Sequence, residues 1–105
     1  MMDFDKLNGL IPAIVQDATT NEVLMLGFMN LAAYEKTLKT NTVTFWSRSR
    51  NTLWTKGETS GNTLEVIEVF VDCDKDTLVI KARVNGDGVC CHTGNRTCFY
   101  EKISG

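Results

Sequence analysis

Proline, histidine and long apolar runs are almost missing from this sequence. Pro12 is the only proline and His92 the only histidine among 105 residues. No stretch approaches the roughly 18 apolar residues of a membrane span, and the N-terminus lacks the basic and apolar regions of a signal peptide. Excess basic charge is also lacking, because the formal net charge is −2. We therefore expect a cytoplasmic protein that binds neither membranes nor long nucleic acid, which usually demands a basic face.

Cysteine is absent from the first 72 residues, and all four cysteines follow: Cys73, Cys90, Cys91 and Cys98. A disulfide framework spreads its cysteines more evenly along the chain, so metal binding or catalysis is the favoured interpretation of these thiols. The C-x-x-C pairs of structural zinc fingers are also absent. A length of 105 residues and a hydrophobic content of 43% suit one domain, residues 1–105, with one core.

Apolar periodicity predicts the elements of the first half of the chain. Residues 11–15 and 22–28 are apolar-rich and flank the turn-rich segment 17–21, which predicts a β-hairpin. Residues 41–47 alternate and predict a strand. Residues 48–62 are polar and contain glycine, and we interpret them as a long functional loop.

A helix is predicted between the hairpin and the next strand. Asn30 suits the N-cap of a helix from Leu31 to about Lys39. Leu31, Tyr34 and Leu38 recur at spacings of three and four, so we expect them to form its apolar face.

The second half predicts three more strands. Residues 64–71 and 77–84 are β-branched and alternating, which favours two antiparallel strands joined by the acidic segment 72–76. Residues 85–88 form another turn, and residues 97–103 predict a last strand. The fold class is therefore α+β and mainly β, a small mixed or antiparallel sheet domain with one clear helix.

Three carboxylates spaced by two, Asp72, Asp74 and Asp76, suggest a site for a hard cation. A flat strand would spread them over about 13 Å, but a turn between strands lets them converge. Three oxygen ligands then suit Mg²⁺. The alternative is a solvated acidic turn. Cys73 lies among them, and its sulfur would point away from the carboxylates or pack as an apolar strand residue.

The remaining thiols suggest a softer ion. Cys91 and Cys98 lie seven residues apart, with Gly94 permitting a reversal between them. With Cys73 they would supply three ligands and leave a fourth position open, which is the catalytic zinc pattern. Two adjacent cysteines rarely bind one ion with good geometry, and spacing alone does not choose between Cys90 and Cys91.

His92 follows these thiols directly, and its near-neutral pKa suits proton transfer beside a metal. Two other interpretations stay open. A non-enzymatic zinc module would close the fourth position with His92 or Cys90. A thiol redox protein would join Cys90 and Cys91 in a strained disulfide.

The loop at 48–62 carries groups that bind anions. Arg48, Arg50 and Lys56 supply cations, and residues 59–61 add hydroxyls and a glycine backbone that can approach a phosphate. The order of a P-loop is missing. Glu58 is interpreted as a surface carboxylate rather than a base.

Taken together, these motifs resemble the phosphoribosyl-AMP cyclohydrolase family of histidine biosynthesis. The resemblance extends from Pro12 to Tyr100 and rests on residues 12–17, 23–30, 47–50, 53–61, 72–76 and 91–99. It implies an intertwined homodimer with one zinc per subunit at the interface, bound by Cys73 of one chain and by Cys91 and Cys98 of the other. It selects Cys91 over Cys90, because the family's cysteine directly precedes His-Thr-Gly. It also implies magnesium at Asp72, Asp74 and Asp76.

The implied reaction is hydrolysis between N1 and C6 of the adenine ring of phosphoribosyl-AMP by zinc-activated water. Three thiolates make zinc a weaker acid than three histidines would, so we expect His92 to act as a helper base. Six residues are expected to hold the substrate phosphates together with magnesium: Arg48, Arg50, Lys56, Thr59, Ser60 and Gly61.

Overall fold

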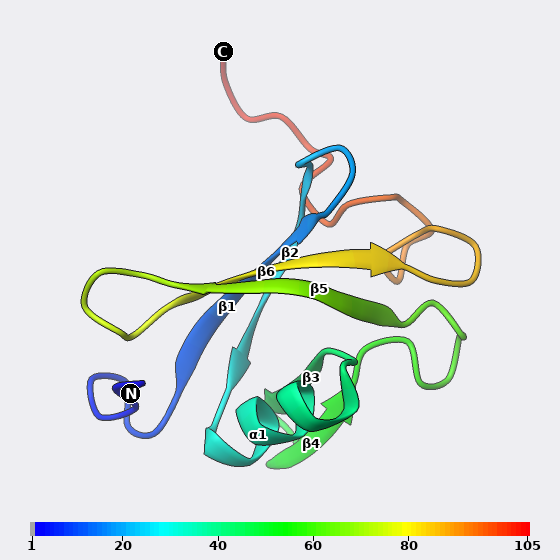
Figure 1. Ribbon diagram of the computed structural model, residues 1–105. Helices are drawn as coiled ribbons and strands as arrows, with labels where there is room; N and C mark the ends of the chain where they lie inside the picture. Colours follow the sequence, from blue (N-terminus) through cyan, green and yellow to red (C-terminus); the bar gives the residue numbers. More distant parts are fainter. Residues whose placement is uncertain (1) are drawn as a thin grey trace.

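A computed structural model describes residues 2–105, and it contains seven elements (Figure 1). Their bounds are β1 Ile11–Asp17, β2 Val23–Met29, α1 Leu31–Thr40, β3 Thr44–Ser47, β4 Thr52–Thr55, β5 Leu64–Val71 and β6 Leu78–Val84. Four strands form a sheet in the order β2-β1-β6-β5, and β3 pairs with β4. The pairing of β1 with β6 is parallel and the others are antiparallel. The predicted α+β class, mainly β with one helix, is confirmed.

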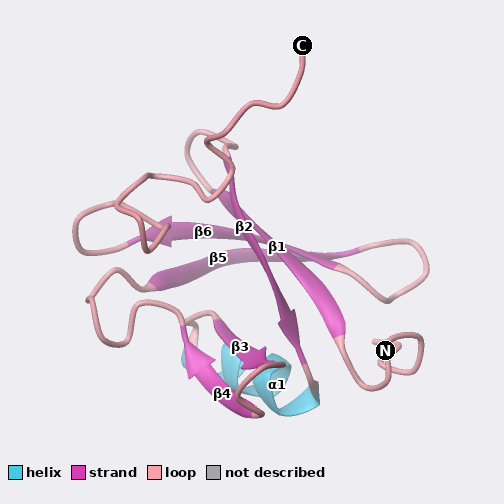
Figure 2. Ribbon diagram, turned by 180° about the vertical axis from the view of Figure 1, so that it is seen from behind, coloured by secondary structure: helices cyan, strands magenta, loops and turns pink. Residues whose placement is uncertain are grey.

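The core lies between the larger sheet and a second layer that contains α1 and the β3–β4 pair (Figure 2). The central strands alternate as predicted: Ile11, Ala13 and Val15 of β1 are buried, and so are Ile80 and Ala82 of β6. Both predicted hairpins, β1–β2 and β5–β6, are present. Period-two alternation identified them because each strand has one buried face.

The helix begins and ends as predicted. The side chain of Asn30 accepts a hydrogen bond from the Ala33 N–H at 2.9 Å, and Asn41 closes the C-terminus in the left-handed conformation. Among residues 2–105 no helix is long and apolar enough to cross a membrane.

The predicted apolar face of the helix was wrong for its two leucines, whereas Tyr34 is partly buried and packs against the core. Leu31 and Leu38 are about half exposed, and the buried residues of α1 are Ala33 and Thr37. The Thr37 hydroxyl donates to the Ala33 carbonyl at 2.8 Å and accepts from the Thr44 N–H at 3.0 Å. These small side chains and the hydroxyl bonds hold α1 close to β3, so the two leucines face outward.

Two further predictions were wrong. The segment 48–62 is not all loop, because β4 pairs with β3 through residues such as Trp54. Residues 97–103 form no strand. The N–H of Cys98 donates to the Leu24 carbonyl at 2.8 Å, and the chain then leaves the sheet with Phe99 and Ile103 exposed.

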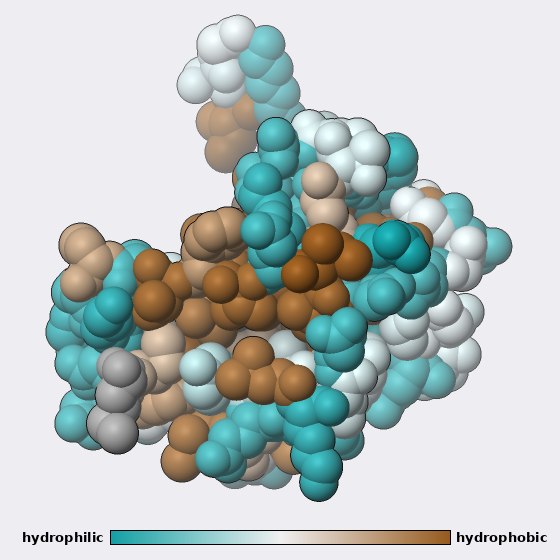
Figure 3. Space-filling view, viewed as in Figure 1, coloured by the Kyte–Doolittle hydropathy of each residue, from teal (hydrophilic) through white to brown (hydrophobic). Residues whose placement is uncertain are grey.

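Apolar side chains gather on the face that carries α1 and β5, where Figure 3 shows a broad band of hydrophobic surface. The exposed large apolar residues of these two elements are Leu31 and Leu38 of α1 and Ile67, Phe70 and Val71 of β5. A groove of about 260 Å³ runs between α1 and β5, lined by Met2, Tyr34, Leu38, Val69, Val71, Lys75 and Leu78. An apolar area of this kind is typical of an interaction surface.

Candidate metal centres and substrate cleft

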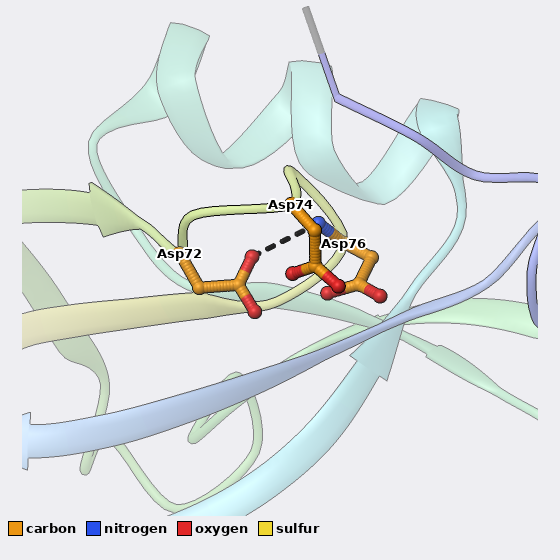
Figure 4. Close-up of side chains that lie close together, drawn as sticks. All are labelled: Asp72, Asp74 and Asp76. Atoms are coloured by element: carbon orange, nitrogen blue, oxygen red, sulfur yellow. Dashed lines mark hydrogen bonds between the residues drawn. The ribbon is translucent and has the colours of Figure 1, made fainter.

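The acidic turn between β5 and β6 brings Asp72, Asp74 and Asp76 together. One carboxylate oxygen from each lies within 4.8 Å of the others (Figure 4). Asp72 Oδ1 accepts from the N–H groups of Asp76 and Thr77 at 3.0 and 3.2 Å, which curls the turn. Lys75 adopts the left-handed conformation at its tip, with φ of 65°. The curvature that the sequence required for convergence is therefore present, and the three oxygens can serve a hard cation.

A lysine from the N-terminal segment contacts this acidic turn. The Nζ of Lys6 lies 2.9 Å from Asp74 Oδ2 and 2.9 Å from Asp76 Oδ2. The hydrogen bond from Lys6 is the main reason that the pKa of Asp76 falls to about 2, and the same bonds raise the pKa of Lys6. Sequence reasoning missed this contact because 68 residues separate Lys6 from Asp74.

The loop after β6 positions Cys90 and Cys91. Both are buried, and Cys90 packs into the hydrophobic core. The Thr93 hydroxyl donates to Cys91 Sγ at 3.0 Å, and this hydrogen bond is the largest cause of the lowered pKa of the Cys91 thiol. Burial raises the pKa of Cys90. Cys91 is therefore the more readily ionised of the adjacent pair and the better metal ligand.

Cys98 returns to the same place. Its thiol lies close enough to Cys90 and Cys91 to interact with both, and burial together with these neighbours raises its pKa to about 11. The positive charge of Lys56 partly offsets the raised pKa of Cys90 and of Cys98, and it adds to the lowering of the pKa of Cys91. The structure thus brings together two of the three predicted zinc ligands, Cys91 and Cys98, near a lysine predicted to bind substrate.

Cys73 lies elsewhere in the chain. Within residues 2–105, the sulfur atoms of Cys73, Cys91 and Cys98 do not all come within 4.8 Å of one another. Cys73 precedes β6 and Cys91 follows it, and the seven residues of that strand span about 20 Å. Within the described residues, one chain therefore does not gather the three predicted zinc ligands.

His92 follows Cys91 directly, and its side chain is exposed. Its place in the chain fixes it beside the thiols, while the exposed side chain is free to reach a bound reactant. That arrangement suits a proton carrier better than a packed structural histidine.

A polar cleft of about 470 Å³ opens beside the turn that joins β3 to β4. It is lined by Ser47, Ser49, Arg50, Trp54, Thr55, Gly57, Glu58, Thr59 and Ser60. Three of the six residues predicted to bind substrate, Arg50, Thr59 and Ser60, therefore face one space. Lys56 and Gly61 do not line it. A cleft with cationic and hydroxyl groups suits a phosphate.

An aromatic hollow of about 490 Å³ adjoins the polar cleft and shares Ser49 and Trp54 with it. Its other lining residues are Leu26, Gly27, Phe28, Phe45, Trp46 and Arg48. The guanidinium of Arg48 lies 4.0 Å from the centre of the Phe28 ring, a cation–π contact. Arg48 therefore lies over an aromatic surface, in the hollow that adjoins the polar cleft containing Arg50.

Three supporting residues were not identified from the sequence: Lys6, Thr93 and Phe28. Thr93 and Phe28 lie inside the motifs that carried the family resemblance, but neither was given a role. The two-residue spacing of Thr93 from Cys91 was the available signal, since a hydroxyl at that distance can reach a thiolate. Nothing local to Lys6 indicates its partners.

The fold and its sites define a small α+β domain. A cluster of three carboxylates precedes β6, a pair of thiols follows it, and a polar cleft adjoins an aromatic hollow. The family model described as Phosphoribosyl-AMP cyclohydrolase matches residues 25–100. A relative named phosphoribosyl-AMP cyclohydrolase from Desulfatibacillum aliphaticivorans is 57% identical over 99% of this chain and 82% of its own length. The chain belongs to the phosphoribosyl-AMP cyclohydrolase family, which is a family of hydrolases, as the sequence motifs predicted.

Other relatives agree. A phosphoribosyl-AMP cyclohydrolase from Syntrophotalea carbinolica is 59% identical over 94% of this chain and 78% of its own length. A relative from Bacteroides thetaiotaomicron, named histidine biosynthesis bifunctional protein HisIE, is 59% identical over 96% of this chain. The chain spans 49% of that longer relative. These names connect the family to histidine biosynthesis.

Proposed function

We propose that this protein hydrolyses the bond between N1 and C6 of the adenine ring of phosphoribosyl-AMP, in the cytoplasm, as a step of histidine biosynthesis. The observation that carries the proposal is the pair Cys91 and Cys98, which lies within the electrostatic reach of Lys56, whose chain neighbours Thr55 and Gly57 line the polar cleft. A reducing compartment would keep these thiols free for a metal.

Zinc fits the thiol pair. Soft thiolates select zinc, and the Thr93 hydroxyl favours the ionised form of Cys91, which is the form that binds a metal. Cys91 and Cys98 would hold the ion with a third ligand, Cys73. When bound there, zinc supplies the Lewis acidity that lowers the pKa of water toward neutrality.

The position of Cys73 supports a homodimer. The sulfur atoms of Cys73, Cys91 and Cys98 do not come together within one chain of the described structure, so in this proposal the third ligand comes from a second copy. The exposed apolar band on α1 and β5 supports such an assembly, since β5 leads directly to Cys73. Each dimer would then hold two equivalent zinc sites.

Magnesium fits the acidic turn. Asp72, Asp74 and Asp76 offer hard oxygen donors within 4.8 Å of one another, and Lys6 already acts as a stand-in cation there. Magnesium bound at the turn supplies positive charge for the substrate phosphates. In a dimer that joins Cys73 to the partner's thiols, the neighbouring carboxylates would be carried toward the same thiols, because Asp72 and Asp74 flank Cys73 in the chain.

The side chains of the cleft divide the work of binding. Arg50, Thr59 and Ser60 in the polar cleft suit one phosphate, and Gly61 adds a backbone donor next to them in the chain. Lys56 supplies positive charge that also reaches the thiols. Arg48 marks the aromatic hollow, which suits the purine base, because bases stack on aromatic side chains.

The chemistry needs two protons to move. Water oxygen adds to C6, the C6–N1 bond breaks, and the oxygen becomes the carbonyl of a carboxamide, so water gives up both protons. One proton goes to N1 and the other to the exocyclic nitrogen on C6, which is an imine in the neutral N1-substituted ring. His92 is the candidate to carry a proton to N1, because it is exposed directly beside Cys91 in the chain and an imidazole can both accept and donate a proton. For this role, a substrate whose purine base lies in the aromatic hollow must have its C6 atom close to Cys91 and His92.

Mixing two inactive variants tests the shared zinc site. Cys73→Ala and Cys98→Ala should each lose zinc and turnover as homodimers. After unfolding together and refolding, mixed dimers contain one intact site, made from Cys73 of one chain and Cys98 of the other. About half of the chains pair in this way, so roughly a quarter of the wild-type turnover should return. Recovery of neither zinc nor turnover in the mixture would overturn the shared site.

A further inference from the structure

The ammonium group of Lys6 occupies the centre of negative charge at the acidic turn. It donates to Oδ2 of Asp74 and to Oδ2 of Asp76, at 2.9 Å in both cases. The third carboxylate, Asp72, is engaged instead with backbone N–H groups of its own turn. Lys6 therefore bridges Asp74 and Asp76, while Oδ1 of Asp72 is held by the backbone of the turn.

The position of Lys6 is set by the N-terminal segment around it. The Asp3 N–H donates to the Lys75 carbonyl at 2.6 Å, which ties the segment to the tip of the acidic turn. The Gly9 N–H donates to the Phe4 carbonyl at 2.7 Å, and the Phe4 ring packs edge-on against Tyr34 of α1. Lys6 lies inside this anchored loop, so its contact with the carboxylates is built into the fold.

A divalent ion needs the same oxygen atoms. Magnesium binds oxygen at about 2.0–2.1 Å in a nearly ideal octahedron and accepts no donor group as a ligand. An ammonium that donates to Asp74 and Asp76 uses their lone pairs and adds a like charge beside the ion. The two cations can share the turn only if Lys6 moves away.

We propose that Lys6 is an internal competitor for the divalent cation. It holds Asp74 and Asp76 together in the metal-free protein, and it leaves them when the ion binds, which loosens the N-terminal segment. This inference rests on the proposed magnesium site. The consequence of the competition is a weaker affinity for the metal, because each binding event has to break two hydrogen bonds of Lys6.

Metal affinity tests the competition. Binding of Mn²⁺, followed by electron paramagnetic resonance at fixed pH and ionic strength, is measured for the wild type, Lys6→Gln, Lys6→Arg and Lys75→Gln. Lys75→Gln is the matched control, because it removes the same positive charge from the same turn. Lys75 is exposed and forms no ion pair in the described residues. Lys6→Gln should bind about fivefold more tightly than Lys75→Gln, the change typical of losing one exposed ion pair. Lys6→Arg should stay close to the wild type.

Hydrogen exchange tests the movement. On saturation with Mg²⁺, residues 3–9 of the wild type should exchange faster, and the same residues of Lys6→Gln should show no change that depends on metal. Equal Mn²⁺ affinity in Lys6→Gln and Lys75→Gln would overturn the competition while leaving the metal site intact. If the wild type binds no Mn²⁺ that Asp74→Asn abolishes, the magnesium site fails and this inference fails with it.

Discussion

Gly27 of β2 lies directly against the ring of Phe45 of β3. A Cβ atom built at position 27 would stand 2.5 Å from Phe45 Cδ1 and 2.6 Å from Cε1. Gly27 keeps an ordinary φ, so the absence of a side chain matters there for space alone. This contact sets how closely the β3–β4 pair approaches the larger sheet, and both residues line the aromatic hollow.

We predict that Gly27→Ala destabilises the protein by about 1–3 kcal/mol through overpacking. The Phe45→Leu change removes the clashing ring, so the double variant should lose less stability than the sum of the two single variants. Urea unfolding of all four proteins measures this coupling. Strictly additive losses would show that the Phe45 ring is not the source of the stability lost in Gly27→Ala.

The adjacent cysteines should separate by role. Cys91→Ala should lose bound zinc and all turnover, because it removes a metal ligand. Cys90→Ala should keep stoichiometric zinc and most turnover while losing about 1–2 kcal/mol of stability, because Cys90 is a buried core residue. Metal analysis, a ring-opening assay and thermal unfolding of both variants check this. An equal loss of turnover in the two variants would refute the assignment.

His92→Ala should keep zinc but slow the reaction. Removing a positioned acid or base typically costs about 10²–10⁴ in rate. Turnover under saturating substrate, together with zinc content, is the measurement, and wild-type zinc content in the variant serves as the control for site integrity. Loss of zinc from the variant would make His92 a ligand instead of a proton carrier.

Asp17 should stabilise the β1–β2 hairpin in a way that depends on pH. Its carboxylate accepts from the Thr19 and Thr20 N–H groups at 2.8 and 3.0 Å, and the Thr20 bond is the main cause of its lowered pKa. A carboxyl whose pKa is lowered on folding adds stability above its unfolded pKa of about 3.9, and this stability disappears as pH falls through the folded pKa.

Asp17→Asn should therefore cost about 1–2 kcal/mol at pH 7 and much less at pH 2. Asp87→Asn is the matched control, because the Asp87 side chain accepts no hydrogen bond in the described structure and lies exposed. Urea unfolding at several pH values compares the two. A cost for Asp17→Asn that stays constant with pH would contradict the role of the charge.

The hairpins and the helix could be predicted because their signals are local. Alternation in residues 11–15 and 64–71 needs only one buried face, and Asn30 caps the helix through a bond to Ala33, three residues away. The helix face could not be predicted in this way. Leu31 and Leu38 have the correct spacing, but the close packing of α1 against β3 buries the smaller side chains of Ala33 and Thr37 instead.

The last predicted strand failed for a related reason. Residues 97–103 have strand-like composition, yet a strand needs a free neighbouring edge over its whole length, and contact with β2 ends near Leu24. Conversely, β4 forms inside a polar segment that predicted a loop. Leu53 and Trp54 pair with β3, and the Trp54 ring packs against Phe45.

For the sites, the sequence by itself determined which chemistry is present: carboxylates spaced by two on a turn, thiols around His92, and a cationic loop. Covalent spacing and side-chain type suffice for that. Only the tertiary structure decided which groups meet. It brought Lys6 to Asp74 and Asp76 and placed the thiol of Cys98 near that of Cys91. It also left Cys73 at the opposite end of β6. Such contacts depend on how whole strands pack, and no local pattern encodes a distance between segments that lie 70 residues apart.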